Sequence, residues 1–332
     1  MSDDIKRRLT GLFGKKESGI TLVLICIFIV LSITAKGFLT PSNLINIGRQ
    51  VSILGIISAG MGLVMIAGKI DISVGSTYCL SAIITASVLV ATGNTALALI
   101  CGFAVGLIIG FINGFLVIKV NMPPFIATFG MLYAVRGLCL ILTEGYPITL
   151  FTEGIDQETN PVFFFLGQGT LFDVIPMELV FMVLVFAIAG FVLHKTNFGI
   201  HIYAIGGSEK SSYVSGIKVD FIRYITYVIT SLLAALAGIL NLSFIGSIIS
   251  TAGNGLEFEV FAAVVIGGVS MSGGEGSIFG MIVGVLVFGI IRNGLILLGI
   301  GQFWQVLIIG LITIGAVAYD SINSMRKLRR GE

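Results

Sequence analysis

Long runs of hydrophobic residues, separated by short polar links, make up most of the chain. A transmembrane α-helix needs roughly 20 consecutive residues that are mostly apolar. Two such runs lie within 44–90, and the others cover 20–34, 96–118, 125–143, 179–192, 224–242, 260–266, 278–291 and 304–317. This pattern predicts an all-α integral membrane protein with about ten transmembrane helices.

The first interruption of the apolar pattern is at residues 68–76, which read GKIDISVGS. An ionised side chain in hydrocarbon costs at least ~2.5 kcal/mol, so Lys69 and Asp71 should be paired or hydrated. Asp71 either pairs with Lys69 or accepts backbone N–H groups at the start of the following helix. Together with Ser73 it is also a candidate for a solute path.

The second interruption, at residues 267–277, places Ser270 and Ser272 among glycines. Irregular backbone at membrane depth is tolerated only where protein covers it or where it lines a water-filled cavity. One interpretation is a tight loop between two helices, in which glycine allows close approach. The other is a part of the solute path. We expect broken or re-entrant segments at both interruptions.

Further polar side chains are embedded in the hydrophobic pattern. Four basic residues, Arg49, Lys69, Arg136 and Arg292, fall within or at the edge of apolar segments. Polar groups near the interruptions suit passage of a solute that forms short-lived hydrogen bonds, but they can equally serve helix packing. The candidate path residues are Asp71, Ser73, Asn113, Arg136, Ser270, Ser272 and Asn293.

The composition excludes several classes of protein. Hydrophobic residues make up 56% of the 332 residues and charged residues only 11%, against roughly a quarter charged in soluble domains. The four cysteines and two histidines show no metal-binding spacing, so we predict no metal site and no catalytic residue. Lys69 lacks the upstream glycine spacing of a Walker loop. We expect no cofactor on this chain, and any ATP must be hydrolysed elsewhere.

The distribution of basic residues predicts the orientation. With ten spans, fourteen lysines and arginines in tails and loops fall on the side of the termini and only Lys36 on the other. Because cytoplasmic loops carry the excess of basic residues, both termini should be cytoplasmic. The expected regions are a cytoplasmic tail at 1–18, an external loop at 144–176, a cytoplasmic region at 196–223 and a cytoplasmic tail at 320–332.

The cytoplasmic region 196–223 contains a segment of small and polar residues that predicts a short surface helix. Ser208 can cap this helix, and Ser215 with Gly216 would end it. Such a helix suits docking on another subunit, although an ordinary connecting loop is the alternative. The candidate coupling residues are Ala204, Gly206, Gly207, Ser208, Glu209, Lys210, Ser215 and Gly216.

Four stretches resemble, in order, the permease subunit of bacterial ABC importers for monosaccharides, the ribose/xylose/galactose class. Residues 68–76 are similar to the GGIDLSVGS of that family, and 121–137 read NMPPFIATFGMLYAVRG, similar to its Pro-Phe-Ile segment. Residues 203–217 resemble its cytoplasmic AxGGN…SGI segment, and 256–280 its ELxAIAAVVIGG…GGxG signature. Three positions depart from the family pattern: Lys69 replaces Gly, Ser208 replaces Asn, and Glu259 replaces Asp.

The resemblance implies a single permease domain over 1–332 that forms a translocation path and is not an enzyme. It implies two cytoplasmic ATPase domains, as two copies or a fused tandem, and a second permease copy or paralogue. An external or periplasmic binding protein would deliver the sugar, and ATP would be used by the partner subunit. The expected location is the bacterial cytoplasmic (inner) membrane, in contact with lipid and without nucleic acid.

Two other functions fit the sequence less well. An ion-coupled secondary transporter or channel would place acidic or histidine residues in mid-span, and only Asp71, Glu257 and Glu259 are candidates. An intramembrane enzyme needs a paired nucleophile and base or a metal set, and the apolar segments contain neither.

Overall fold

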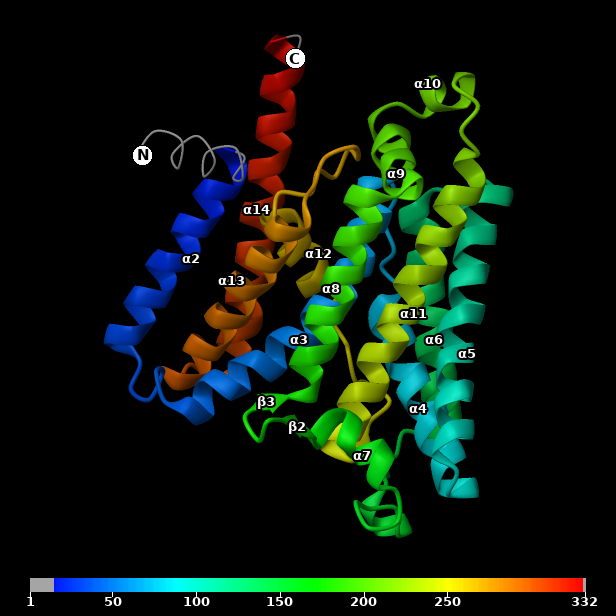
Figure 1. The fold of residues 1–332 in the computed structure, drawn as a ribbon, viewed down its shortest axis with the longest axis vertical. Coiled ribbons are helices and arrows are strands. Elements are labelled where there is room, and N and C mark those ends of the chain that lie inside the picture. The colour runs from blue at the N-terminus through cyan, green and yellow to red at the C-terminus, as the bar shows by residue number, and fades with distance from the viewer. Residues whose placement is uncertain (1–14, 331–332) are drawn as a thin grey trace.

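The computed structural model of the chain describes residues 15–330. The predicted tail at 1–18 lies mostly outside the described residues, as do residues 331–332. Figure 1 shows an all-α arrangement of long helices. Its elements, in chain order, are α2 (Lys15–Thr34), α3 (Pro41–Ile66), α4 (Val74–Thr92), α5 (Thr95–Gly114), the π-helical η1 (Phe115–Lys119), α6 (Pro124–Thr143), β1 (Ile148–Thr149), the 3₁₀-helical η2 (Phe151–Glu153), α7 (Pro161–Gln168), β2 (Thr170–Leu171), β3 (Ile175–Pro176), α8 (Met177–Lys195), α9 (Asn197–Gly207), α10 (Glu209–Val214), α11 (Val219–Ile245), β4 (Ser247–Ile248), α12 (Leu256–Ile266), α13 (Ile278–Leu297) and α14 (Gln302–Arg330).

Each predicted apolar run lies in a helix, but not every one of these helices is long enough to span a membrane. By length and composition, seven described helices qualify: α3, α4, α5 with η1, α6, α8, α11 and α13. The apolar parts of α2 and α14 are shorter, at Ser18–Thr34 and Gln302–Gly315. Helix α12 has 11 residues, which at 1.5 Å per residue cover about half of a 30 Å bilayer core. The count of ten spans therefore stays a prediction.

Glycine and proline set many of the helix ends. Helix α3 begins with Pro41 in its first turn and ends before Gly68, whose φ is +77°. Helix α4 stops at Gly93 in the left-handed conformation, and the side chain of Asn94 caps the start of α5 by accepting from Leu97 N. After η1 the backbone turns at Asn121, whose φ is +60°, and Pro124 begins α6 at the first helical position, where proline is tolerated.

Helix α11 is the central element, and it packs against α3, α4 and α5. Helix α5 approaches it through Gly106 and Gly110. A Cβ atom would lie 2.7 Å from Ser231 O at Gly106 and 2.6 Å from Val228 Cα at Gly110. Small residues at intervals of four allow two membrane helices to come this close. Helix α3 is mostly buried, whereas α5, α6 and α8 expose most of their apolar side chains on the outside of the bundle.

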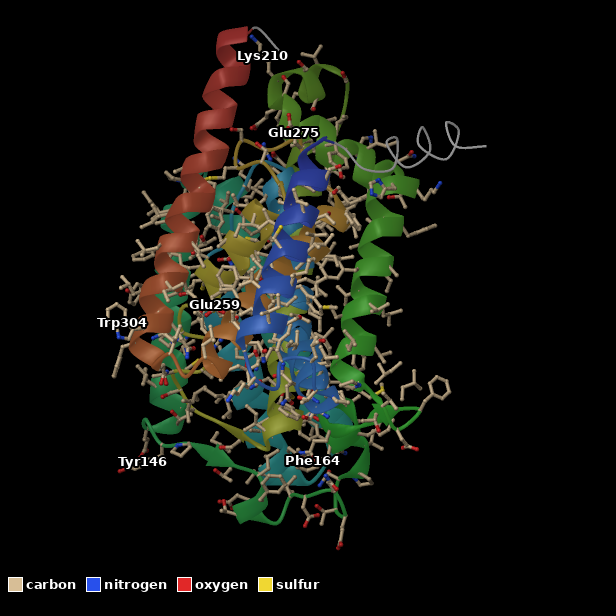
Figure 2. All side chains as sticks on the ribbon, turned by 90° about the vertical axis from the view of Figure 1, so that its left-hand side faces the viewer. Tyr146, Phe164, Lys210, Glu259, Glu275 and Trp304 are labelled. Carbon is tan, nitrogen blue, oxygen red and sulfur yellow. The ribbon has the colours of Figure 1, made fainter. Side chains whose placement is uncertain are left out.

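The two ends of the molecule differ. We call them the α10 end and the α7 end. In Figure 1, α9, α10 and the last turns of α14 lie at one end, and α7, β2 and β3 lie at the other. Figure 2 places Lys210 at the α10 end and Tyr146 and Phe164 at the α7 end. The α7 end is tied together by two short antiparallel pairings, β1 with β4 and β2 with β3.

Candidate functional site

The first interruption of the apolar pattern forms a non-helical link, residues 67–73, between α3 and α4. The fully buried Asp71 accepts hydrogen bonds from the backbone N of Ser73 at 2.9 Å and from its hydroxyl at 2.7 Å. Asn113 on α5 donates to the Ser73 hydroxyl at 2.8 Å and to Asp71 Oδ2 at 3.3 Å. Asp71, Ser73 and Asn113 therefore form one buried cluster, and Asp71 accepts a backbone N–H just before α4.

Lys69 lies apart from Asp71, since no ion pair joins them among the described residues. Partial burial lowers the pKa of the Lys69 ammonium, and the nearby positive charge of Arg223 lowers it further. Asp71 was expected either to pair with Lys69 or to accept N–H groups at the start of α4. Its contacts correspond to the second role, because it accepts hydrogen bonds from the Ser73 backbone and from side chains.

A second break precedes the half-length helix α12. Residues 249–255 are irregular and lead from β4 to the start of α12. Arg136 on α6 donates through Nη1 to Ser250 O at 2.8 Å and to Ala252 O at 2.7 Å. A guanidinium carries several donors in a fixed fork, which suits it to satisfy carbonyl groups that have left a helix. Arg136 thus holds the backbone that precedes α12.

The glycine-rich loop 267–277 lies at the α10 end, where Figure 2 labels Glu275. Gly274 N donates to Ile66 O at 2.8 Å, and a Cβ atom on Gly206 would lie only 1.8 Å from the same oxygen. Three chain segments therefore meet backbone to backbone at the end of α3. Ser270 is buried and its hydroxyl accepts from Ser272 N, so both serines belong to this loop.

Asn293 on α13 forms a reciprocal pair with Asn43 on α3. Each side-chain amide donates to the other, at 2.9 and 3.0 Å, and both side chains are buried. The seven candidate path residues thus fall into a cluster around Asp71, a clamp on residues 250–252, a loop at the α10 end and an amide pair. Their role in a path remains a prediction.

A cavity of about 380 Å³ opens between α3, α4, α8, α11, α12 and α13. It is within the size range of small-molecule sites. None of the seven candidate path residues lines it. Its polar lining consists of Arg49, Gln50, Tyr78, Glu178, Asn241, Asn254, Glu259 and Arg292.

The charged residues of the cavity have different partners. Arg292 Nη1 lies 2.8 Å from Glu259 Oε2, with 47% and 17% of the two side chains exposed. The Arg49 guanidinium stacks over the Phe244 ring at 4.4 Å from its centroid, a favourable cation–π geometry. Arg49 and Arg292 are among the four basic residues that the sequence places within or at the edge of apolar segments. Basic residues in apolar segments therefore point to this cavity, whereas the polar residues near the two interruptions do not line it.

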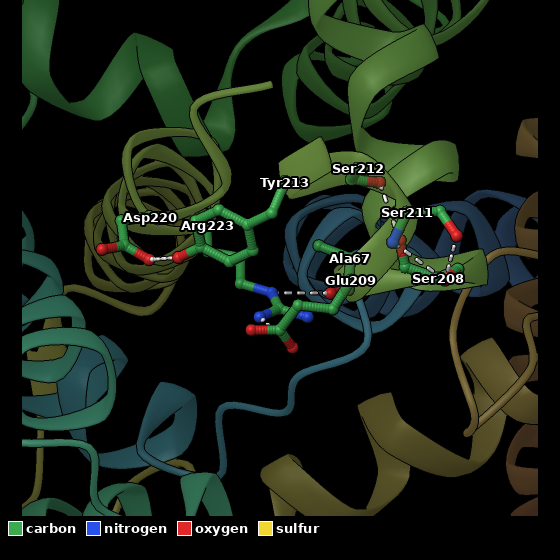
Figure 3. A network of polar contacts seen from close by, with 8 residues as sticks. All are labelled: Ala67, Ser208, Glu209, Ser211, Ser212, Tyr213, Asp220 and Arg223. Carbon is green, nitrogen blue, oxygen red and sulfur yellow. Dashed lines mark hydrogen bonds and ion pairs between the residues drawn. The ribbon is translucent and has the colours of Figure 1, made fainter. Parts of the chain in front are cut away.

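The predicted coupling region consists of α9 and α10. Figure 3 shows that the Ser208 hydroxyl accepts from Ser211 N at 3.3 Å and donates to the Ser211 hydroxyl, which caps the six-residue helix α10. Residues Val214, Ser215 and Gly216 end it, with Gly216 at φ +78°.

An ion pair connects α10 to the interior. Glu209, half exposed, lies 2.7 Å from the buried guanidinium of Arg223 on α11. The Nε of Arg223 also donates to Ala67 O at 3.1 Å, at the start of the 67–73 link (Figure 3). Beside it, Tyr213 donates to Asp220, which raises the pKa of the Tyr213 phenol. Arg223 therefore joins α10, α11 and the first broken segment.

Comparisons with known proteins define the class of the chain. Residues 43–317 match the family described as the permease component of branched-chain amino acid transport systems. The chain belongs to this family of transporter permeases, and its apolar helices make it a multi-pass membrane protein.

Individual relatives carry more specific names. The ribose import permease protein RbsC of Bacillus subtilis is 43% identical over 252 residues, 76% of each chain. That of Escherichia coli K12 is 37% identical over 263 residues, 79% of this chain and 80% of the relative. The autoinducer 2 import system permease protein LsrC of Yersinia pestis is 33% identical over 254 residues, 76% of this chain and 70% of the relative. No solved structure matches.

Proposed function

We propose that the chain is the membrane-spanning subunit of an ATP-driven importer for a monosaccharide. The observation that carries this proposal is the identity of 43% to a ribose import permease over 76% of both chains. An identity of this size over most of the length supports a shared transport class, whereas the fold alone would not. An ion-coupled transporter or channel is the alternative from the sequence, and the family match favours the importer.

In this proposal the chain works with partners. A cytoplasmic ATPase, as two copies or a fused tandem, hydrolyses ATP, and an external binding protein delivers the sugar. A second permease copy or a paralogue completes the membrane part. The α10 end, with α14's last turns, then faces the cytoplasm of a bacterial inner membrane, and the chain crosses that membrane about ten times.

The coupling step would use the connection through Arg223. Closure of the ATPase pair upon ATP binding would move α10, and the Glu209–Arg223 ion pair of 2.7 Å with the Arg223–Ala67 hydrogen bond of 3.1 Å would transmit this movement to the 67–73 link. A rigid-body switch of this kind opens a path alternately to each side, driven by the differential binding of nucleotide and sugar to the two states.

Reconstitution tests this proposal. The purified chain in proteoliposomes should take up D-ribose only when an ATPase subunit, the binding protein and ATP are all supplied. An ATPase subunit that binds but does not hydrolyse ATP is the matched control and should give no uptake. Sugar uptake driven by a proton or sodium gradient, with this chain alone, would contradict the importer function.

A further inference from the structure

The cavity between α3, α4, α8, α11, α12 and α13 contains a carboxyl group of which one oxygen has no hydrogen-bond partner among the described residues. Glu178, in the first turn of α8, lines the cavity and is only 1% exposed. Its Oε2 atom is buried and accepts no hydrogen bond from residues 15–330. A buried acceptor without a donor destabilises the fold, and more so if it is charged, so such atoms call for an explanation.

The charged side chains around Glu178 determine which kind of ligand could donate a hydrogen bond to it. Two arginines, Arg49 and Arg292, and two glutamates, Glu178 and Glu259, line the cavity, so its formal charge is zero. Because Arg292 is paired with Glu259, Arg49 and Glu178 are left as the second pair of opposite charges. No ion pair within 4 Å joins them among the described residues.

A neutral ligand with several hydroxyl groups fits this arrangement. A hydroxyl can donate to a carboxylate and accept from a guanidinium or an amide at the same time. A cation would be repelled by Arg49, and an anion by Glu178. The apolar side chains of Leu54, Leu256 and Phe288, which also line the cavity, would contact the C–H groups of such a molecule.

We propose that this cavity is a binding site for one neutral monosaccharide, in which the Glu178 carboxylate accepts a sugar hydroxyl and Arg49 donates to another. The proposal deepens the importer function and rests on it for the choice of sugars. Glu178 is then a specificity-determining residue for polyhydroxylated solutes, whereas Glu259 and Arg292 neutralise each other.

Cysteine protection measures binding in the cavity without requiring transport. Asn254 lines the cavity and is exposed, so an Asn254→Cys variant should react with a membrane-impermeant thiol reagent applied to the α7 end. Cys26 and Cys101 are not buried and would be replaced by serine, so that they do not react with the reagent. Cys79 and Cys139 are buried and can stay. The full-length chain in membrane vesicles would be labelled with and without millimolar D-ribose, D-xylose or D-galactose.

We expect at least one of these sugars to slow labelling several-fold. Adding Glu178→Leu should raise the sugar concentration that gives half protection by about tenfold or more, the loss of one hydrogen bond to a charged group. Glu178→Gln, which keeps one acceptor oxygen, should raise it less. The matched control Glu158→Gln, at an exposed position of the external loop, should leave protection unchanged.

Two results of the labelling experiment itself would overturn the site, and comparison with uptake adds two more. One is unchanged protection in Glu178→Leu when the unprotected labelling rate and the membrane level are normal. The other is stronger protection by ribose 5-phosphate than by ribose, because an anion requires excess positive charge. ATP-dependent ribose uptake by the reconstituted complex without any protection would leave the importer function standing and refute this cavity as the sugar site. Absence of both uptake and protection would refute both.

Discussion

Lys69 carries an unfavourable charge at the end of α3. It is partly buried and near Arg223, and both circumstances lower its pKa. A lysine whose pKa is lower in the folded than in the unfolded protein destabilises the fold while it is protonated. Below the folded-state pKa this penalty is complete, and it disappears as the pH rises from that pKa through the unfolded value.

Replacing Lys69 by methionine should therefore stabilise the protein at neutral pH. We expect the Tm of the detergent-solubilised chain to rise by roughly 1–3 °C at pH 7. The gain should diminish as the pH is raised toward 10.5, the ordinary lysine pKa. Lys210→Met, at an exposed position, is the control and should change Tm little at either pH. A gain for Lys69→Met that is independent of pH would rule out the charge as its cause.

For single residues, the sequence predicts which polar side chains lie in apolar surroundings, but it does not predict which residues they contact. Asp71 and Ser73 were singled out by their apolar surroundings, and the structure places them together with Asn113. Their connection to α5 depends on contacts 40 and 42 residues apart along the chain, which no local pattern encodes. The sequence did not identify Glu178 as a candidate site residue, because it stands at the end of a long polar segment in which a glutamate is common.

Among the elements, α9 ends in two adjacent glycines with opposite surroundings. A Cβ atom on Gly206 would lie 1.8 Å from Ile66 O and 2.3 Å from Gly274 N, both backbone atoms that cannot move aside easily. No atom of the described residues lies within 4 Å of a Cβ atom on Gly207, and this residue is exposed. Gly206 is a packing position and Gly207 a surface position.

This difference gives a matched pair of substitutions. Gly206→Ala should destabilise the fold by about 1–3 kcal/mol, the typical cost of overpacking, and lower both Tm and membrane level. Gly207→Trp should leave both unchanged but abolish stimulation of the ATPase by sugar-loaded binding protein, if the surface of α10 docks on that subunit. Normal stimulation in a Gly207→Trp complex with normal membrane level would remove Gly207 from the coupling surface.

The elements also show where sequence reasoning reached its limit. The ends of α12 at Ile266 and of α13 at Ile278 follow directly from where the apolar runs stop and start. The short helix α7 was not predicted within the polar stretch 144–176, because eight residues carry too little periodicity to identify a helix. That α12 begins only at Leu256, after irregular backbone held by Arg136, requires a contact 114 residues away.

For the whole molecule, the opposite positions of Glu158 and Lys210 predict labelling from opposite sides. Residue 158 belongs to the segment at the α7 end and Lys210 to the α10 end (Figure 2). Cysteines introduced at Glu158 and Lys210 should react with an impermeant thiol reagent only from outside and only from inside, respectively. The control is permeabilised vesicles, in which both should react. Reaction of both positions from one side of intact vesicles would show that the number of spans between them is even.

The amide pair of Asn43 and Asn293 joins residues 250 positions apart. A ribosome that adds ~5–20 residues per second needs about 12–50 s to synthesise the sequence between them. During that time the Asn43 amide has only its local hydrogen bond to Phe38 O, at 2.8 Å. Its oxygen must be satisfied by water, lipid headgroups or a chaperone, because Asn293 has not yet been made. Insertion of α13 completes this contact, so the first part of the bundle acquires its final packing only near the end of synthesis. A chain truncated before Asn293 therefore leaves the Asn43 oxygen without its native donor, which makes α3 a target for quality-control proteases.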